Sequence, residues 1–290
     1  WDKEYNKAAR TLEEAQEEAK KTSQALDDAK ASSEKLTQDI SAYTDIRDAM
    51  AEMTEGTQEW NDALKESNEQ VLNLLQNYPE LAKYVTRDSD GQLSIASEGL
   101  DELQDRQAKN LAYLNLANTQ ANAALNKATL NNQRVELRRN IDYVDNGTPD
   151  WGFNRKNMTD SELDSLLDAV RAQGEHILTS DSAIAEALKV DVSDPIVQAV
   201  KENANSLLDY YHKSETDDKV NRIAVEEAAL QALKLQDGFQ EDGGNAKEIA
   251  AIVAQEATKQ SAEMEQKYQK QFDSKDLSLS DLGFMYQDIT

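Results

Sequence analysis

The first fifty residues carry a seam of apolar and small residues alternately three and four positions apart, and this spacing most constrains the fold. An average spacing of 3.5 residues is the period of a coiled coil rather than of a single helix on a globular surface. The helix would be about 75 Å long at 1.5 Å per residue. Because many seam positions are alanines, a partner helix must approach closely. The seam residues are Tyr5, Ala8, Leu12, Ala15, Ala19, Thr22, Leu26, Ala29, Ser33, Leu36, Ile40 and Tyr43.

A second long helix is predicted for residues 97–144, after a first helix of residues 3–53 and a compact insert of residues 56–96. Two helices of similar length around an insert favour an antiparallel coiled-coil hairpin with the insert as its tip. In this hairpin we expect Ala19 near Val135. Asn118 and Asn132 fall near the seam, where a buried Asn can fix the register. In the alternative arrangement, which stays open, the two helices never meet and associate with copies of the chain.

The tip is predicted to contain a short helix and a β-hairpin. Thr57 is a good N-cap for the helix, which Pro79 ends. Two short runs in which apolar and polar residues alternate flank Asp90-Gly91, which is a strong signal for a β-hairpin. This hairpin is the only β-structure expected in the chain. We expect a small core in the tip, made of Trp60, Leu64, Leu75, Tyr78, Leu81 and Tyr84.

Shorter helices are predicted beyond the turn-forming residues 146–153. Thr159 with Glu162 forms a capping box, Ser180 starts a second helix, and Asp194-Pro195 opens a third that continues through Leu208. Further helices are expected at 219–235 and 245–272, with a loop at 236–244 between them and a terminal turn at 278–288. The predicted fold is therefore all-α, with a coiled-coil hairpin in residues 1–145 and a bundle of shorter helices in residues 146–290.

The composition and motifs argue against an enzyme. The net charge is −25, from 31 basic and 56 acidic residues, so nucleic acid and anionic lipid are poor partners. Cysteine is absent, and no apolar run approaches the ~20 residues of a membrane span. His176 and His212 lack a second His at metal spacing. Asp88-Ser89-Asp90-Gly91 fits a hairpin turn better than a calcium loop, so we expect no catalytic residue, metal or cofactor.

One stretch of the second long helix is expected to contact more than its coiled-coil partner. No charged residue lies between Lys109 and Lys127, although a solvated helix face normally carries charge. Tyr113 and Leu116 point away from the seam, so a third helix from residues 159–272 or another copy of the chain should cover them. Together with the tip aromatics Trp60, Tyr78 and Tyr84, they form the predicted contact surface.

The tip sequence resembles a module of bacteriophage tail tape measure proteins, in which a helix ending in "YPEL" precedes a short hairpin and a new coiled-coil helix. The resemblance lies in Leu74–Tyr84, Asp90–Ile95 and Gly99–Leu103. It implies a non-enzymatic rod in the virion, within the lumen of the phage tail, where it sets tail length. It also implies partners that are other tail proteins or copies of the chain, and a parent protein longer than this segment, in keeping with a start at Trp1.

A second hypothesis is an adaptor or binding module of a large bacterial protein, in the cytoplasm or at the cell surface. In that case the tip, residues 56–96, would be the recognition surface. The long helices would then carry the tip rather than act themselves.

Overall fold

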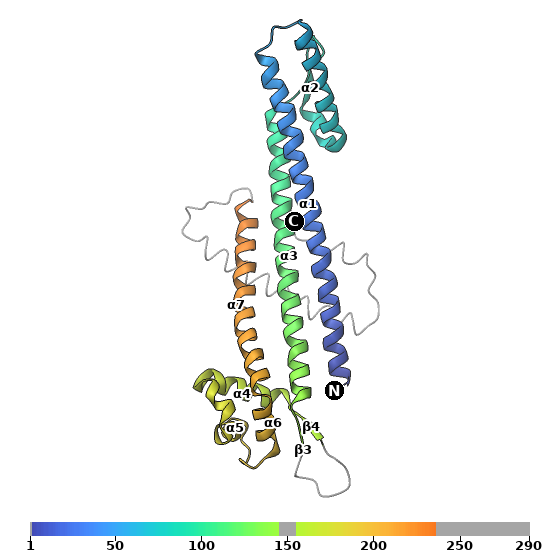
Figure 1. The fold of residues 1–290 in the computed structure, drawn as a ribbon. Coiled ribbons are helices and arrows are strands. Elements are labelled where there is room, and N and C mark those ends of the chain that lie inside the picture. The colour runs from blue at the N-terminus through green and yellow to red at the C-terminus, as the bar shows by residue number, and fades with distance from the viewer. Residues whose placement is uncertain (1, 145–154, 236–290) are drawn as a thin grey trace. The chain divides into compact units, whose positions relative to one another are not determined.

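The computed structural model describes residues 2–144 and 155–235, and this part of the chain is helical with two short antiparallel strand pairs (Figure 1). The predicted all-α class is confirmed. The chain divides into two compact units, Trp1–Ala224 and Val225–Thr290. Whether a domain boundary lies at residue 145, as the sequence predicts, stays a prediction.

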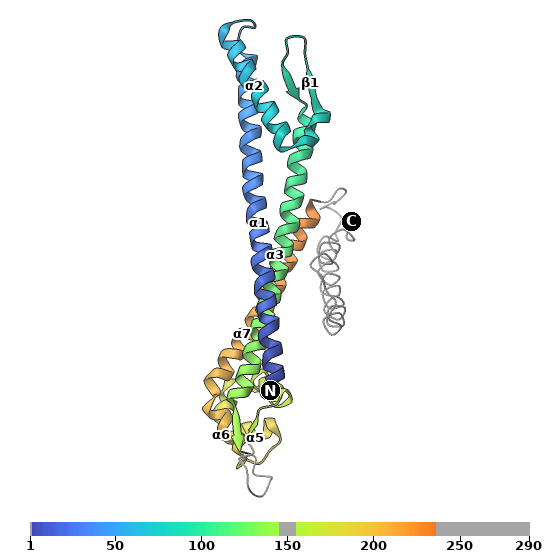
Figure 2. The same cartoon turned by 90° about the vertical axis from the view of Figure 1, so that its right-hand side faces the viewer.

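The two longest helices, α1 (Asp2–Ala51) and α3 (Ser97–Asn140), lie side by side in both views (Figures 1 and 2). They run antiparallel, because Glu4 at the start of α1 pairs with Arg138 at the end of α3, with 2.7 Å between Oε1 and Nη1. Every residue of the predicted α1 seam is buried or half-buried. The predicted hairpin is therefore confirmed, and the helices meet within one chain.

The register differs from the expected one. Thr22 contacts Asn118 and Glu4 contacts Arg138, so the residue numbers of facing pairs add up to 140 and 142. This register places Ala19 opposite residues 121–123, and the expected neighbourhood of Ala19 and Val135 is wrong. Because α1 begins beside the last turns of α3, Val135 lies beside the first two turns of α1.

The second long helix is shorter than predicted, because α3 ends at Asn140 and not near Val144. The N–H of Ile141 closes the helix with a 3.0 Å bond to the Leu137 carbonyl. The next residues form β3 (Asp142–Val144), which pairs with β4 (Arg155–Asn157) in the register Tyr143↔Lys156. The prediction of a single hairpin in the chain is therefore wrong. The residues between these strands, 145–154, lie outside the described part.

The tip contains α2 (Gln58–Asn77), the 3-10 helix η1 (Pro79–Tyr84) and the strands β1 (Val85–Arg87) and β2 (Leu93–Ile95). The Thr57 hydroxyl accepts a bond from the Trp60 amide, as predicted for an N-cap. β1 and β2 pair as an antiparallel hairpin with Thr86 opposite Ser94. This hairpin is the one expected around Asp90-Gly91.

The tip core includes α1, which the sequence prediction left out. Tyr78 and Leu81 are buried as expected, and Leu75 and Tyr84 pack partly against the core. Trp60 and Leu64 are only half-buried and do not belong to it. The core is centred further along α2 because the end of α1 supplies part of it. Its buried residues are Leu36, Ile40, Tyr43, Val71, Leu74, Tyr78, Leu81, Ile95, Leu100 and Leu103.

The helices that follow β4 are α4 (Asp160–Gln173), η2 (Glu175–Thr179), α5 (Asp181–Leu188), α6 (Pro195–Glu202) and α7 (Ala204–Lys234). Of these helices, α4, α5 and α6 begin at the predicted caps. The capping box of Thr159 and Glu162 is present, and Ser180 and Asp194 cap their helices. Residues of α4, η2, α5, α6 and the start of α7 pack with the end of α3 in one hydrophobic core. It includes Leu137, Ile141, Met158, Leu163, Leu166, Val170, Ile177, Leu178, Ile184, Ile196, Val197, Val200 and Leu207.

Two predicted helices are divided differently in the structure. The helix from Pro195 ends at Glu202, because the side-chain amide of Asn203 bonds the Ala199 carbonyl at 2.9 Å and closes it. A new helix, α7, starts at Ala204 and continues through residue 219, where a separate helix was expected. In the second unit the described residues are the end of α7, with Ala228, Ala229 and Ala232 buried. The predicted elements at 236–244, 245–272 and 278–288 lie outside the described residues.

Candidate interaction surfaces

The seam between α1 and α3 combines alanines with larger apolar residues, and a polar contact crosses it at Thr22. Ala8, Ala19 and Leu26 of α1 are each no more than 6% exposed. The Thr22 hydroxyl lies 3.3 Å from the Asn118 amide oxygen, which places the predicted Asn118 across the seam. Asn132, by contrast, donates to Glu136 of its own helix. Asn118 therefore contributes a contact specific to one register.

The β-hairpin of the tip is fixed to α2 by one side chain. Asn68 accepts a 2.7 Å bond from the Leu93 amide and donates a 3.1 Å bond to the Gly91 carbonyl. On the other side, the buried Tyr43 hydroxyl of α1 accepts a 3.0 Å bond from the Ile95 amide. The hairpin is thus attached to both helices at its backbone, which gives the tip a defined surface.

Tyr84 joins the tip to the first turns of α3. Its ring lies against Gly99 so closely that a Cβ atom at that position would overlap it. Its hydroxyl bonds the Glu102 carboxylate, which also pairs with Lys83 at 3.2 Å. The bond from Tyr84, and then that from Lys83, lowers the pKa of Glu102. Glycine at position 99 is therefore required by a close approach and not by its backbone angles.

In the turn of the β-hairpin, backbone amides donate hydrogen bonds to the Asp88 carboxylate. One Asp88 carboxylate oxygen accepts bonds from the Asp90 amide at 3.0 Å and the Gln92 amide at 2.8 Å. Gly91 has a φ of 89°, the left-handed region that favours glycine. These contacts explain the Asp-x-Asp-Gly sequence as a turn. In the described part of the chain, no group of three or more acidic, His or Cys residues is arranged to hold a metal ion.

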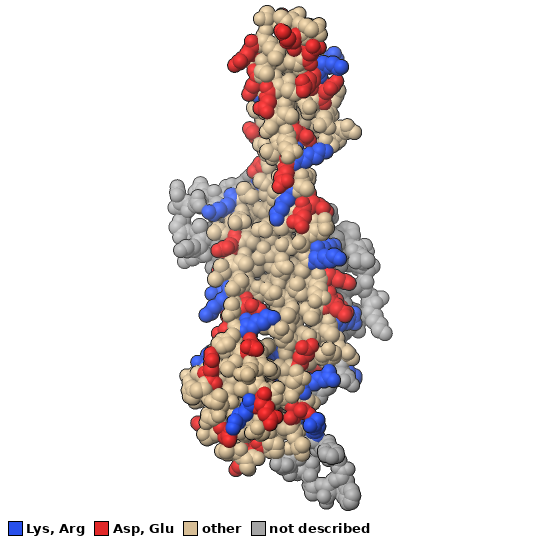
Figure 3. Space-filling model, viewed as in Figure 1, with Lys and Arg blue, Asp and Glu red and all other residues tan. Residues whose placement is uncertain are grey.

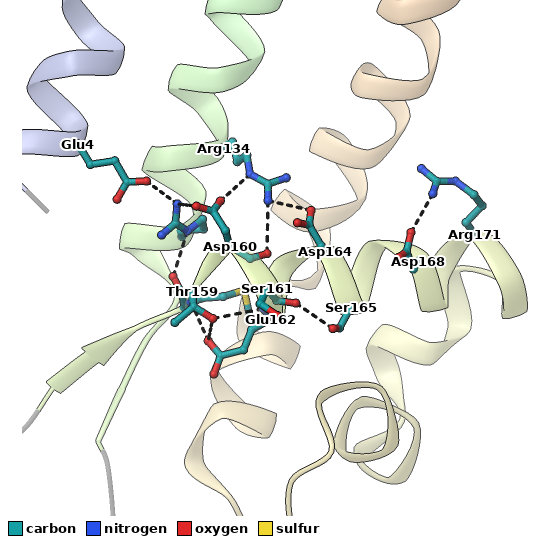
Figure 4. Close-up of polar contacts among 12 residues, drawn as sticks. Glu4, Arg134, Thr159, Asp160, Ser161, Glu162, Asp164, Ser165, Asp168 and Arg171 are labelled. Atoms are coloured by element: carbon teal, nitrogen blue, oxygen red, sulfur yellow. Dashed lines mark hydrogen bonds and ion pairs between the residues drawn. The ribbon is translucent and has the colours of Figure 1, made fainter. Parts of the chain in front are cut away.

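The end of the α1–α3 pair that lies away from the tip carries an arginine cluster, which the sequence analysis did not predict (Figure 4). The side chain of Arg138 is only 7% exposed and pairs with Glu4 and Asp160, each at 2.7 Å. It also donates a 3.2 Å bond to the Met158 carbonyl. Arg138 therefore connects the start of α1, the end of α3 and the first turn of α4.

Arg134 extends this cluster one helical turn away. It pairs with Asp160 and Asp164, each at 2.8 Å. Burial alone lowers the pKa of Arg134, but its hydrogen bonds with Asp160 and Asp164 outweigh that effect and raise the pKa. Arginines four residues apart at a helix end are a sequence signal, but the carboxylate partners of Arg134 lie 26 and 30 residues further along the chain, and Arg138 also pairs with Glu4 of α1.

The five residues predicted as a contact surface are placed differently from one another. Tyr113 is 49% exposed, whereas Tyr78 is buried in the tip core at 8%. Trp60, Tyr84 and Leu116 are half-buried. The structure does not bring the five together, because three belong to the tip and two to the middle of α3. Their role as contacts stays a prediction.

The uncharged stretch from Asn110 to Asn126 lies in the middle of α3. On the face drawn in Figure 3, charged side chains crowd the tip, and the middle part over α3 is largely free of them. A later helix contacts the end of this stretch, because the Asn126 amide donates a 2.8 Å bond to Asn221 of α7. Amide groups, which both donate and accept, thus form the contact between these two helices.

The two histidines lie in the helices after β4. His212 of α7 pairs with Glu175 of η2 at 2.9 Å, and both side chains are more than half exposed. His176 precedes a buried pair, Ile177 and Leu178. His212 and Glu175 thus form an exposed polar contact between two helices.

Comparison with models of known protein families, with curated proteins and with solved structures gave no match. Within residues 2–144 and 155–235, no helix combines the length and the apolar character that crossing a membrane requires.

Proposed function

We propose that the chain is a non-catalytic structural segment that acts through helix association, as in phage tail tape measure proteins. The observation that carries this proposal is the long α1–α3 pairing through a seam that combines alanines with larger apolar residues. Ala8 and Ala19 are 3% and 6% exposed, although they lie on a helix whose other faces are charged. A pairing of this kind is suited to making a stiff element rather than a catalytic centre.

The assignment to a phage tail rests on the resemblance of the tip sequence. In the structure, the "YPEL" residues Tyr78–Leu81 lie at the turn from α2 into η1, and the hairpin and α3 follow in the order typical of that module. The location that follows is the virion, with other tail proteins as partners. No role in binding nucleic acid directly is proposed, because the chain is strongly acidic.

Localisation tests the proposal. An antibody raised against residues 97–140 should detect the chain on an immunoblot of denatured, purified phage tails, and the chain should sediment with intact particles. Detection only in phage-free bacterial cytoplasm or at the cell surface would contradict the tail assignment.

The adaptor hypothesis is favoured by a different observation, the structure of the tip. The tip packs on a core that it shares with α1 and the start of α3, and it exposes Leu72 of α2 to 56%. Replacing residues 57–95 by a short loop separates the two functions. Incorporation into tails should survive the replacement if the rod is the working part, whereas an adaptor would lose its binding.

A further inference from the structure

The uncharged stretch of α3 carries a second seam, separate from the one that faces α1. Tyr113, Ala117, Gln120 and Ala124 are spaced four, three and four residues apart, so they lie on one face of the helix. Tyr113, Gln120 and Ala124 are exposed, and Ala117 is half-buried. We call these four residues the outer seam. Asn118, which contacts α1, and Asn126, which contacts α7, lie on other faces of α3.

We propose that the outer seam binds the outer seam of a second copy of the chain, with the two α3 helices antiparallel. This inference rests on the proposed function, since it names one partner for helix association. The partner is argued below from charge, from side-chain size and from the polar groups of the seam.

Charge favours a second copy over a basic partner at this place. Two chains that each carry a net charge of −25 repel one another wherever their acidic surfaces meet. The stretch from Asn110 to Asn126 is the part of α3 where they can approach without placing like charges together. It is about 26 Å long at 1.5 Å per residue. A basic partner would gain more by binding the acidic faces elsewhere.

The sizes of the side chains fit an antiparallel pair. When two copies of the outer seam are related by a two-fold axis at its midpoint, Tyr113 of one copy faces Ala124 of the other. Gln120 then faces Ala117, so each large side chain meets a small one, as close helix packing requires. The flanking cations also avoid each other, because Lys127 faces Asn110 of the other copy.

The polar groups of the outer seam can form hydrogen bonds with the same groups of a second copy. The Gln120 amide both donates and accepts, so two related copies can satisfy each other. The chain already uses such a contact, because the side chains of Asn126 and Asn221 pair at 2.8 Å between α3 and α7.

Sedimentation equilibrium of the full chain tests the proposal. We expect a reversible dimer at micromolar concentrations, the weak end of the affinities of protein interfaces. Association should strengthen from about 0.05 to 0.5 M NaCl, because salt screens the repulsion between acidic chains. A chain that stays monomeric, or a dimer that salt weakens, would overturn the proposal.

Two sets of variants locate the contact. Q120E with A124E places charge in the outer seam and should raise the dissociation constant at least about tenfold, since the new carboxylates would be buried against Ala117 and Tyr113 of the other copy without a counter-charge. The matched control, Q16E with A25E, makes the same changes at exposed positions of α1 and should repel only weakly. A dimer equally sensitive to both pairs contradicts the assigned face.

An exchange of sizes tests the antiparallel arrangement. A124Y alone should weaken the dimer, because two tyrosines would then face each other. Adding Y113A restores the large-to-small pairing and should recover the affinity, and failure to recover it contradicts this geometry. A monomeric chain would not remove the proposed tail role, which is tested separately by localisation.

Discussion

At the scale of single residues, the packing of α2 in the tip leaves a buried polar atom without a hydrogen bond. Ser67 of α2 is fully buried, and in the described part of the chain its hydroxyl has no hydrogen-bond partner. A buried hydroxyl without a partner costs about 1–3 kcal/mol. Ser67 therefore contributes its small size to the helix interface rather than its polar group.

Ser67→Ala should stabilise the chain. The substitution removes the unpaired hydroxyl and leaves the volume nearly unchanged, so the gain should exceed the roughly 0.5 kcal/mol expected from helix propensity alone. Urea unfolding measures it. Ser23→Ala, at an exposed position of α1, gives the propensity effect by itself. Destabilisation by Ser67→Ala would mean that the hydroxyl has a partner.

At the scale of elements, the contacts that orient the tip are local and exposed, whereas its core is shared with α1. Tyr84 connects η1 to Gly99 and Glu102 of α3. Because Glu102 is exposed, water screens its bonds, and they position the tip more than they stabilise it. The buried residues Leu36, Ile40 and Tyr43 of α1 carry the greater part of the packing.

The pH dependence of this contact has a definite sign. The pKa of Glu102 is lowered by the bonds from Tyr84 and Lys83. The contact is therefore present above the ordinary pKa of a glutamate and is lost as the pH falls through the lowered value. Tyr84→Phe removes the strongest bond and should raise the pKa of Glu102 towards its ordinary value. An NMR titration of the Glu102 carboxyl measures the change, with Tyr113→Phe as the control. An unchanged pKa in Tyr84→Phe would show that Tyr84 does not donate to Glu102.

The elements differ in how well the sequence predicts them. The caps at Thr57, Thr159, Ser180 and Asp194 were predictable because each depends on a few adjacent residues. The second strand pair was not predictable in this way. β3 follows directly after a long helix, and its partner β4 begins only at Arg155. Tertiary pairing decides its structure, and local pattern does not reveal it.

The same distinction applies to the candidate surfaces. The uncharged stretch of α3 is visible in the sequence, and the structure adds which side chains face α1 and which remain exposed. The arginine cluster was missed, because Arg138 obtains its partners from α1 and α4, far away in the chain. The tip core was misplaced at Trp60 for a related reason, as residues of α1 shift its centre towards Val71 and Leu74.

At the scale of the molecule, the first unit is organised by the pairing of α1 with α3. One end of the pair carries the tip, and the other end is held by Glu4, Arg138 and Asp160. The seam alone does not specify the register, because alanines at regular spacing allow shifts by a heptad. The Thr22–Asn118 contact and the Glu4–Arg138 pair select one register, and the proposed structural role depends on it.

Cross-linking between positions 22 and 118 tests this account most directly. The chain has no cysteine, so Thr22→Cys with Asn118→Cys gives the only thiol pair. A short bismaleimide should join the two thiols within one chain. Thr22→Cys with Asn131→Cys, shifted by about 20 Å along α3, should not react within the chain. Cross-links that form only between chains, or preferentially at position 131, would contradict the hairpin and its register.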